Sequence, residues 1–142
     1  MSTVKAIPDG YHTLTPYLLV ADVGAVLEWL RAAFGAEARG NIDSSQGFIR
    51  HAEVRIGDSP LMLGSAGDGS AKPAILYMYV EDVDAVYARA VAAGGRSIQA
   101  PSVQFYGDRT AAVEGPGGNQ FWIATHVEEV SPAELAERAK SH

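Results

Sequence analysis

The chain has 142 residues and a formal net charge of −6, with 11 lysines and arginines, 17 aspartates and glutamates, and no cysteine. The lack of cysteine excludes disulfides, thiolate zinc sites and cysteine nucleophiles, and scattered positive charge argues against a nucleic-acid partner, which requires a basic surface. No apolar run approaches the ~20 residues of a membrane helix, and residues 1–10 lack a secretory signal pattern. We therefore expect a cytoplasmic protein with no membrane partner.

The sequence repeats itself with an offset of 60 residues. Nine of the 19 positions from 17 to 35 are identical to the residues 60 positions later, including Asp22 and its counterpart Asp82. A fixed period of self-similarity indicates repeated supersecondary units. Convergence of two amphipathic helices is the weaker explanation, because the strand and the aspartate before each helix match as well.

Each copy predicts a strand, a helix and three further strands. Asp22 and Asp82 stand where helix N-caps belong, and apolar residues then recur every three or four positions. Gly35 and Gly94 are placed to end the helices in the left-handed conformation. The expected strands are 15–20, 38–43, 48–56 and 60–64 in the first copy, and 75–80, 96–99, 109–114 and 119–126 in the second.

These elements predict an α+β fold built from two βαβββ modules in one domain over 1–142. Module one covers about 11–67 and module two about 73–127, with a linker at 68–73. Ser131-Pro-Ala-Glu134 has the pattern of a helix N-terminus with a capping box. We expect a C-terminal helix over about 131–139, at the surface or in a subunit contact.

Several motifs resemble those of the vicinal oxygen chelate superfamily, which includes glyoxalases, bleomycin-resistance proteins and dioxygenases. They are V-x-D-V at both strand–helix junctions, Tyr11-His-Thr-Leu-Thr-Pro-Tyr-Leu18, which is typical of the PhnB-like branch, Phe34-Gly-Ala36, His51-Ala-Glu-Val-Arg-Ile-Gly-Asp58 and Gln104-Phe-Tyr-Gly-Asp-Arg109. The resemblance covers residues 11 to about 138. It implies a curved mixed sheet with helices on the convex side, a concave cavity, and a homodimer.

The resemblance also implies four positions at which metal-dependent members hold a divalent ion, usually through His or Gln and Glu. They correspond here to Thr15, Met62, Ile75 and Trp122. These side chains do not make a hard-cation site of oxygen and imidazole ligands. We therefore expect no metal ion and no other cofactor.

Alternation along the opening and closing strands is expected to fill that cavity with aromatic rings instead. The predicted lining residues of these strands are Thr15, Tyr17, Met62, Ile75, Tyr77, Tyr79 and Trp122. Exposed rings in a concave site indicate a ligand or a partner. Rings that only fill the cavity, or form a dimer interface, are the alternatives.

The strand 48–56 alternates between apolar and polar side chains. Ala52 and Val54 are predicted on the buried side, and His51, Glu53 and Arg55 on the cavity side. A carboxylate beside an imidazole raises its pKa, so His51 and Glu53 are candidates for a general base or a ligand anchor. A solvated polar face or an interface salt bridge explains the same pattern.

The segment 104–109 is the remaining concentration of aromatic and charged side chains. Phe105 and Tyr106 suit the mouth of a pocket, and Arg109 is a candidate for binding a carboxylate or phosphate in a bidentate manner. A structural ion pair is an equally good explanation of Arg109. Asp108 and Arg109 are adjacent, so each should have a different partner, and the lone His126 is expected to be structural.

Three functions fit this sequence. The first is a metal-free protein that binds a hydrophobic or aromatic small molecule, with antibiotic sequestration as the role that the resemblance implies. The second is a lyase or isomerase with a shifted site that uses His51, Glu53 and Arg109. The third is a non-catalytic protein whose aromatic face is a subunit contact.

Overall fold

The computed structural model describes residues 4–39, 47–66 and 70–142. The chain divides into two compact units, Met1–Pro73 and Ala74–His142, and each contains one four-stranded mixed sheet. The α+β fold with two βαβββ modules is thus confirmed. Within the described residues, no helix is both long and apolar enough to span a membrane.

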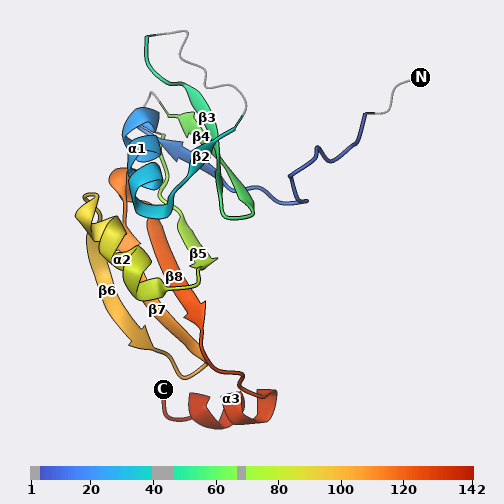
Figure 1. Cartoon of the computed structure of the whole chain (residues 1–142), viewed down its shortest axis with the longest axis vertical. Coiled ribbons are helices and arrows are strands. Elements are labelled where there is room, and N and C mark those ends of the chain that lie inside the picture. Colours follow the sequence, from blue (N-terminus) through green and yellow to red (C-terminus); the bar gives the residue numbers. More distant parts are fainter. Residues whose placement is uncertain (1–3, 40–46, 67–69) are drawn as a thin grey trace. The chain divides into compact units, whose positions relative to one another are not determined.

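The first unit has the strand order β1-β4-β3-β2, with β1 parallel to β4 and the other neighbours antiparallel (Figure 1). Its elements are β1 (Tyr17–Val20), α1 (Val23–Phe34), β2 (Glu37–Ala38), β3 (His51–Ile56) and β4 (Ser59–Ser65). The helix α1 packs against β3 and β4. Leu18 and Val20 are buried, whereas Tyr17, which precedes Leu18 and points to the opposite face, is exposed.

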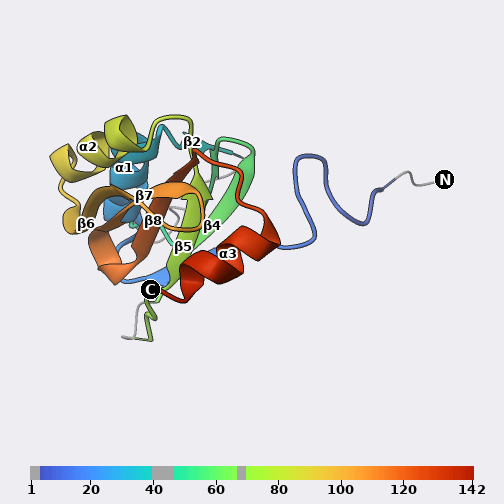
Figure 2. The same ribbon diagram turned by 90° about the horizontal axis from the view of Figure 1, so that it is seen from below.

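The second unit has the strand order β5-β8-β7-β6, with β5 parallel to β8. Its elements are β5 (Ile75–Tyr79), α2 (Val83–Ala92), β6 (Arg96–Val103), β7 (Asp108–Glu114), the 3-10 turn η1 (Pro116–Gly118), β8 (Gln120–His126) and α3 (Pro132–Ala139). The helix α2 packs against β6, β7 and β8 (Figure 2). One face of this sheet is therefore covered by α2.

The repeated aspartates cap the two helices in the same way. Asp22 accepts a hydrogen bond from the backbone N–H of Ala25 at 3.1 Å, and Asp82 accepts one from Ala85 at 3.2 Å. Both caps satisfy N–H groups that have no partner within the helix. The equivalence of the two copies is thus confirmed at the strand–helix junction.

Most strand boundaries differ from the sequence-based prediction by one to three residues, and the differences are largest for β6 and β2. The strand β6 continues to Val103 instead of ending at Gln99, and its pairing with β7 shifts register on both sides of Gln99. Such irregularities let a strand pass a proline, here Pro101, which donates no hydrogen bond to the ladder. The strand β2 is Glu37–Ala38, and the rest of the predicted strand, from residue 40, lies outside the described residues.

The C-terminal helix begins where the capping motif predicts. Ser131 accepts a hydrogen bond from the backbone N–H of Glu134 at 3.1 Å, and Pro132 occupies the first turn. Arg138 in the last turn of α3 also donates to Glu134, at 3.0 Å. The helix is therefore stabilised at both ends by its own polar side chains.

Candidate functional site

The sheet face of the second unit opposite α2 carries aromatic side chains. Tyr77 on β5 pairs in register with Trp122 on β8, and Tyr79 lies two residues further along β5. The side chains of alternate residues Phe121 and Ile123 are buried, whereas Tyr77 and Tyr79 are 46% and 64% exposed. The alternation predicted from the sequence is therefore present, and the two tyrosine rings are partly exposed on this face.

Asp108, the first residue of β7, organises this face. Its Oδ2 accepts hydrogen bonds from the Tyr77 hydroxyl at 2.7 Å and from the Tyr79 hydroxyl at 2.9 Å, and its Oδ1 lies 2.9 Å from Nδ1 of His126. Burial raises the pKa of the Asp108 carboxyl, but the hydrogen bonds from Tyr77, His126 and Tyr79 outweigh it, and the pKa lies below its ordinary value. The 3% exposed carboxylate is thus ionised at neutral pH.

The two tyrosine rings are held in place by this carboxylate. Their centroids are 5.5 Å apart and their planes meet at 65°, an edge-to-face arrangement. Burial and hydrogen bonds to Asp108 and Tyr106 raise the pKa of Tyr77, and the hydrogen bond to Asp108 raises the pKa of Tyr79. Both hydroxyls therefore stay protonated and donate to Asp108 across the physiological range.

His126, the last residue of β8, connects Asp108 to the segment that follows. Its Nε2 lies 3.2 Å from Oε1 of Glu129. The hydrogen bond to Asp108 raises the pKa of His126 above its ordinary value, against a smaller effect of burial, and Glu129 adds to the increase. Two carboxylates facing the two ring nitrogens favour the imidazolium form, in which both nitrogens donate.

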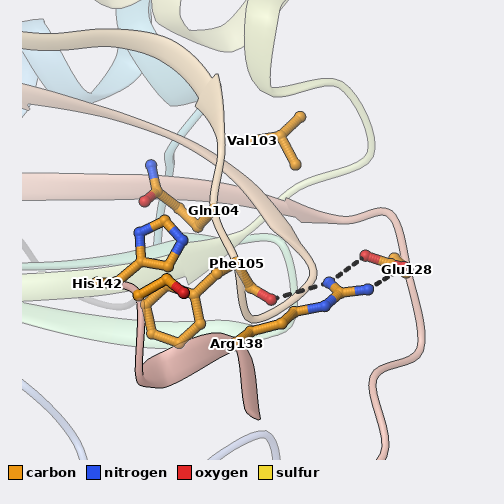
Figure 3. A pocket seen from close by; sticks show the side chains of 7 residues that line it. Val103, Gln104, Phe105, Glu128, Arg138 and His142 are labelled. Carbon is orange, nitrogen blue, oxygen red and sulfur yellow. Dashed lines mark hydrogen bonds and ion pairs between the residues drawn. The ribbon is translucent and has the colours of Figure 1, made fainter. Parts of the chain in front are cut away.

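The segment between β6 and β7 is fastened to the C-terminal helix. Arg138 of α3 donates to the backbone carbonyl of Phe105 at 3.0 Å and to both carboxylate oxygens of Glu128 at 2.8 and 2.9 Å (Figure 3). The Phe105 ring stacks on His142 at 4.8 Å between centroids, beside an open pocket of about 410 Å³. Phe105 thus faces the C-terminal segment, whereas its neighbour Tyr106 interacts with Tyr77.

Arg109 lies away from the tyrosines. Its guanidinium pairs with Asp84 in the first turn of α2, with distances of 3.2 Å from Nε and 3.1 Å from an Nη atom. Successive residues of β7 point to opposite faces, so Asp108 faces the tyrosines while Arg109 faces α2. The expectation that these two residues have different partners is confirmed, and the structure does not bring Arg109 together with the aromatic rings.

The first unit has a counterpart of this face. Tyr17, the repeat equivalent of Tyr77, is half exposed, and its hydroxyl lies 3.4 Å from Nδ1 of His51. Its ring rests against Gly64 on β4, where a Cβ atom would collide with the Tyr17 hydroxyl. Tyr17 pairs in register with Met62, and Thr15 is half-buried just before β1. Tyrosine is thus retained at one position in both copies, with histidine near it in one and aspartate in the other.

His51 and Glu53 share a face of β3 as predicted, but the contact between them is long. Nε2 of His51 and Oε1 of Glu53 are 3.8 Å apart, whereas the Tyr11 hydroxyl donates to Oε2 of Glu53 at 2.6 Å. That hydrogen bond raises the pKa of Tyr11, and the Arg39 guanidinium lies 4.7 Å from the centre of the Tyr11 ring. Tyr11 is therefore the closer partner of Glu53.

Comparison with known proteins gives the family of this chain. Residues 11–123 match the model of the Glyoxalase/Bleomycin resistance protein/Dioxygenase superfamily. The chain belongs to this superfamily. The uncharacterized protein Mb0911c of Mycobacterium bovis is 30% identical to it over 134 residues, which cover 86% of this chain and 88% of that protein.

Solved structures of other proteins have the same fold as this superfamily member. TioX from Micromonospora sp. ML1 superposes with a TM-score of 0.72 and 24% identity, covering 82% of this chain and 99% of TioX. A glyoxalase/bleomycin resistance protein/dioxygenase family enzyme from Burkholderia phytofirmans PsJN gives a TM-score of 0.67 and 20% identity, covering 80% and 97%. At these identities the likeness concerns the fold.

Three of the four positions that the resemblance assigns to metal ligands lie on the two sheets of this superfamily member, and the fourth, Thr15, lies just before β1. Met62 and Trp122 pair with Tyr17 and Tyr77, and Ile75 is exposed at the start of β5. Over residues 4–39, 47–66 and 70–142, no group of three or more His, Cys, Asp or Glu side chains is arranged to hold a metal ion.

Proposed function

We propose that this protein binds a planar aromatic or hydrophobic small molecule on the open sheet face of its second unit, without using a metal ion. The observation that carries the proposal is the pair of exposed tyrosine rings whose hydroxyls are both held by Asp108. By its Tyr11–Leu18 motif we place the protein in the PhnB-like branch, and antibiotic sequestration is the proposed role.

The arrangement favours binding for two physical reasons. A stacked or edge-to-face aromatic contact contributes about 0.5–1.5 kcal/mol beyond the area it buries. Ordering a flexible side chain on binding costs about 0.5–1.5 kcal/mol, and the hydrogen bonds to Asp108 order the Tyr77 and Tyr79 rings before a ligand arrives. Most of the contact energy is therefore available for affinity.

The proposed contacts centre on β5 and β8 of the second unit. The proposed contact residues of the second unit are Ile75, Tyr77, Tyr79, Tyr106 and Trp122. The corresponding face of the first unit carries Thr15, Tyr17 and Met62. Phe105 and Arg109 contact His142 and Asp84 instead. We therefore assign those two residues a structural role.

The test is a binding assay with planar aromatic probes. Bleomycin, 2-methylnaphthalene and 2-naphthol are titrated into a Trp29→Phe background, where Trp122 alone fluoresces, and the melting temperature of the parent protein is recorded with each probe. A ligand that binds the native state must raise the melting temperature. Tyr79→Leu should weaken binding of the best probe by about 2- to 13-fold, which corresponds to the contact energy above.

Tyr87→Leu is the matched control, because Tyr87 lies on α2 and its hydroxyl donates to Ser97. It should leave the affinity within a factor of two. If no probe raises the melting temperature, or if both variants weaken binding equally, the proposal is wrong.

A second candidate function is that of a lyase or isomerase using His51. The observation in its favour is the polar cluster in which Tyr17 approaches His51 and Tyr11 holds Glu53. Such an enzyme would lose turnover in a His51→Ala variant and keep it in a Tyr79→Leu variant. The opposite result would favour the aromatic face.

We further propose that the protein is a cytoplasmic homodimer. Light scattering gives the mass in solution for the parent protein and for a Tyr79→Arg variant. A dimer that Tyr79→Arg dissociates would favour a subunit contact over a ligand site.

A further inference from the structure

The hydroxyl protons of Tyr77 and Tyr79 on the aromatic face have a fixed direction. Tyr77 and Tyr79 both approach the same oxygen, Oδ2 of Asp108, at 2.7 and 2.9 Å. An ionised carboxylate accepts hydrogen bonds and has no proton to donate. Each tyrosine must therefore supply its own proton to Asp108, and neither proton is free for a ligand.

Because both hydroxyl protons point to Asp108, the hydroxyl oxygens can only accept hydrogen bonds from a ligand. A phenolic hydroxyl has one proton and an oxygen that accepts hydrogen bonds. With its proton on Asp108, the oxygen of the 64% exposed Tyr79 presents only lone pairs to the solvent side. A ligand atom that approaches Tyr79 must bring the proton, because two acceptors facing each other gain no hydrogen bond.

The local charge acts in the same direction. Asp108 and Glu129 contribute two carboxylates on either side of the His126 ring. The charge beside the two aromatic rings is therefore net negative whether the imidazole is protonated or neutral. Ring faces attract cations as well, by about 0.5–2 kcal/mol depending on solvation.

Building on the proposed function, we propose that the ligand of this face carries a hydrogen-bond donor next to its planar ring, in the form of an ammonium or other N–H group. An aromatic carboxylate of the same shape is excluded, since it would place acceptor oxygens against acceptor oxygens and add negative charge to a negative site. The preference for a donor group over an acceptor group thus results from Asp108, which fixes the direction of the Tyr77 and Tyr79 hydroxyl protons.

Three naphthalenes of the same shape test this inference at pH 7. They are 2-(aminomethyl)naphthalene, which is an ammonium donor, 2-naphthoic acid, which is an anionic acceptor, and 2-methylnaphthalene, which is neither. The amine should bind at least tenfold more tightly than the acid. An acid that binds as tightly as the amine overturns this inference and leaves the proposed function standing, whereas failure of all three probes to bind overturns the proposed function itself.

Two variants locate the selectivity in the hydrogen bonds. Tyr79→Phe keeps the ring and removes the acceptor oxygen, so the affinity for the amine should fall about tenfold more than that for 2-methylnaphthalene. Asp108→Asn removes the charge and introduces a donor, so the preference for the amine over the acid should shrink below about threefold. An unchanged preference in both variants overturns the inference.

Glu137→Gln is the control for net charge alone. Glu137 lies exposed on α3, where it pairs with Lys140 at 3.1 Å, so its replacement removes the same charge from the same unit. The preference for the amine should remain within a factor of two of the parent value. An equal loss in Glu137→Gln and Asp108→Asn would attribute the selectivity to overall charge and overturn the inference.

Discussion

Replacing Gly107 with alanine should destabilise the second unit more than replacing Gly57 destabilises the first. Both glycines have positive φ, +98° and +60°, so both substitutions place an L side chain in the left-handed region. Their surroundings differ. A Cβ atom on Gly107 would collide with the backbone carbonyl oxygen of Glu128 and lie 3.1 Å from a Val130 methyl group, whereas among the described residues nothing lies within 4 Å of a Cβ on Gly57.

The two costs can be estimated from this geometry. The left-handed conformation costs a non-glycine residue about 1–2 kcal/mol, which is the whole effect expected at Gly57. At Gly107 the neighbouring backbone is fixed, because the N–H groups of Val127 and Glu128 donate to the Gly107 carbonyl at 2.9 and 3.1 Å. Overpacking adds about 1–3 kcal/mol, so Gly107→Ala should cost about 2–5 kcal/mol in total.

Urea unfolding followed by tryptophan fluorescence measures both effects separately. Trp29 lies in α1 of the first unit and Trp122 in β8 of the second. Gly107→Ala is therefore measured in a Trp29→Phe background, where Trp122 reports, and Gly57→Ala in a Trp122→Phe background. Equal losses of unfolding free energy, or a smaller loss at Gly107, would refute the argument from the Glu128 carbonyl.

Three further predictions concern a titration, a ring contact and a helix cap. The hydrogen bond to Asp108 raises the pKa of His126 above its ordinary value of 6.5. The protonated His126 therefore stabilises the folded state fully below pH 6.5, and this stabilisation is lost as the pH rises through the pKa of His126 in the folded protein. The urea midpoint should fall over this range, and His126→Gln should remove the fall; an unchanged profile would contradict the link. Gly64→Ala should push the Tyr17 ring into solvent, which costs less than about 1 kcal/mol but shifts the NMR signals of the neighbouring histidine ring; unchanged signals would contradict the contact. Asp82→Ala should destabilise the second unit by about 1 kcal/mol in urea unfolding through loss of the cap, and a neutral result would show that another group caps α2.

Local patterns in the sequence predicted much of this fold, because helix caps and strand alternation depend only on residues that are close in the chain. The capping aspartates follow from the first turn of each helix, and the exposed Tyr77 and buried Phe121 follow from alternation along single strands. The boundary of β6 did not follow, since a bulged strand next to Pro101 resembles a strand that has ended. Bulges depend on the partner strand, which a local pattern does not contain.

The organising role of Asp108 was missed for a related reason. The predicted strand starts at residue 109, so Asp108 was left in the preceding loop, although it is the first residue of β7. Its contacts with Tyr77 and Tyr79 join β7 to β5, which lies two strands away in the sheet, and a local pattern does not contain such a contact. Alternation along β8 could have placed His126 on the face of Trp122, since it lies four residues further along the strand. Its contact with Asp108 could not be predicted in this way, because it depends on the register between β7 and β8.

The tyrosine that both copies retain has a different hydrogen-bond partner in each unit. In the second copy a carboxylate dictates the sense of the Tyr77 hydrogen bond, whereas the nitrogen of His51 near Tyr17 accepts in one tautomer and donates in the other. The Tyr77 hydroxyl therefore has a fixed donor role, whereas the hydrogen bond of the Tyr17 hydroxyl changes direction with the tautomer of His51.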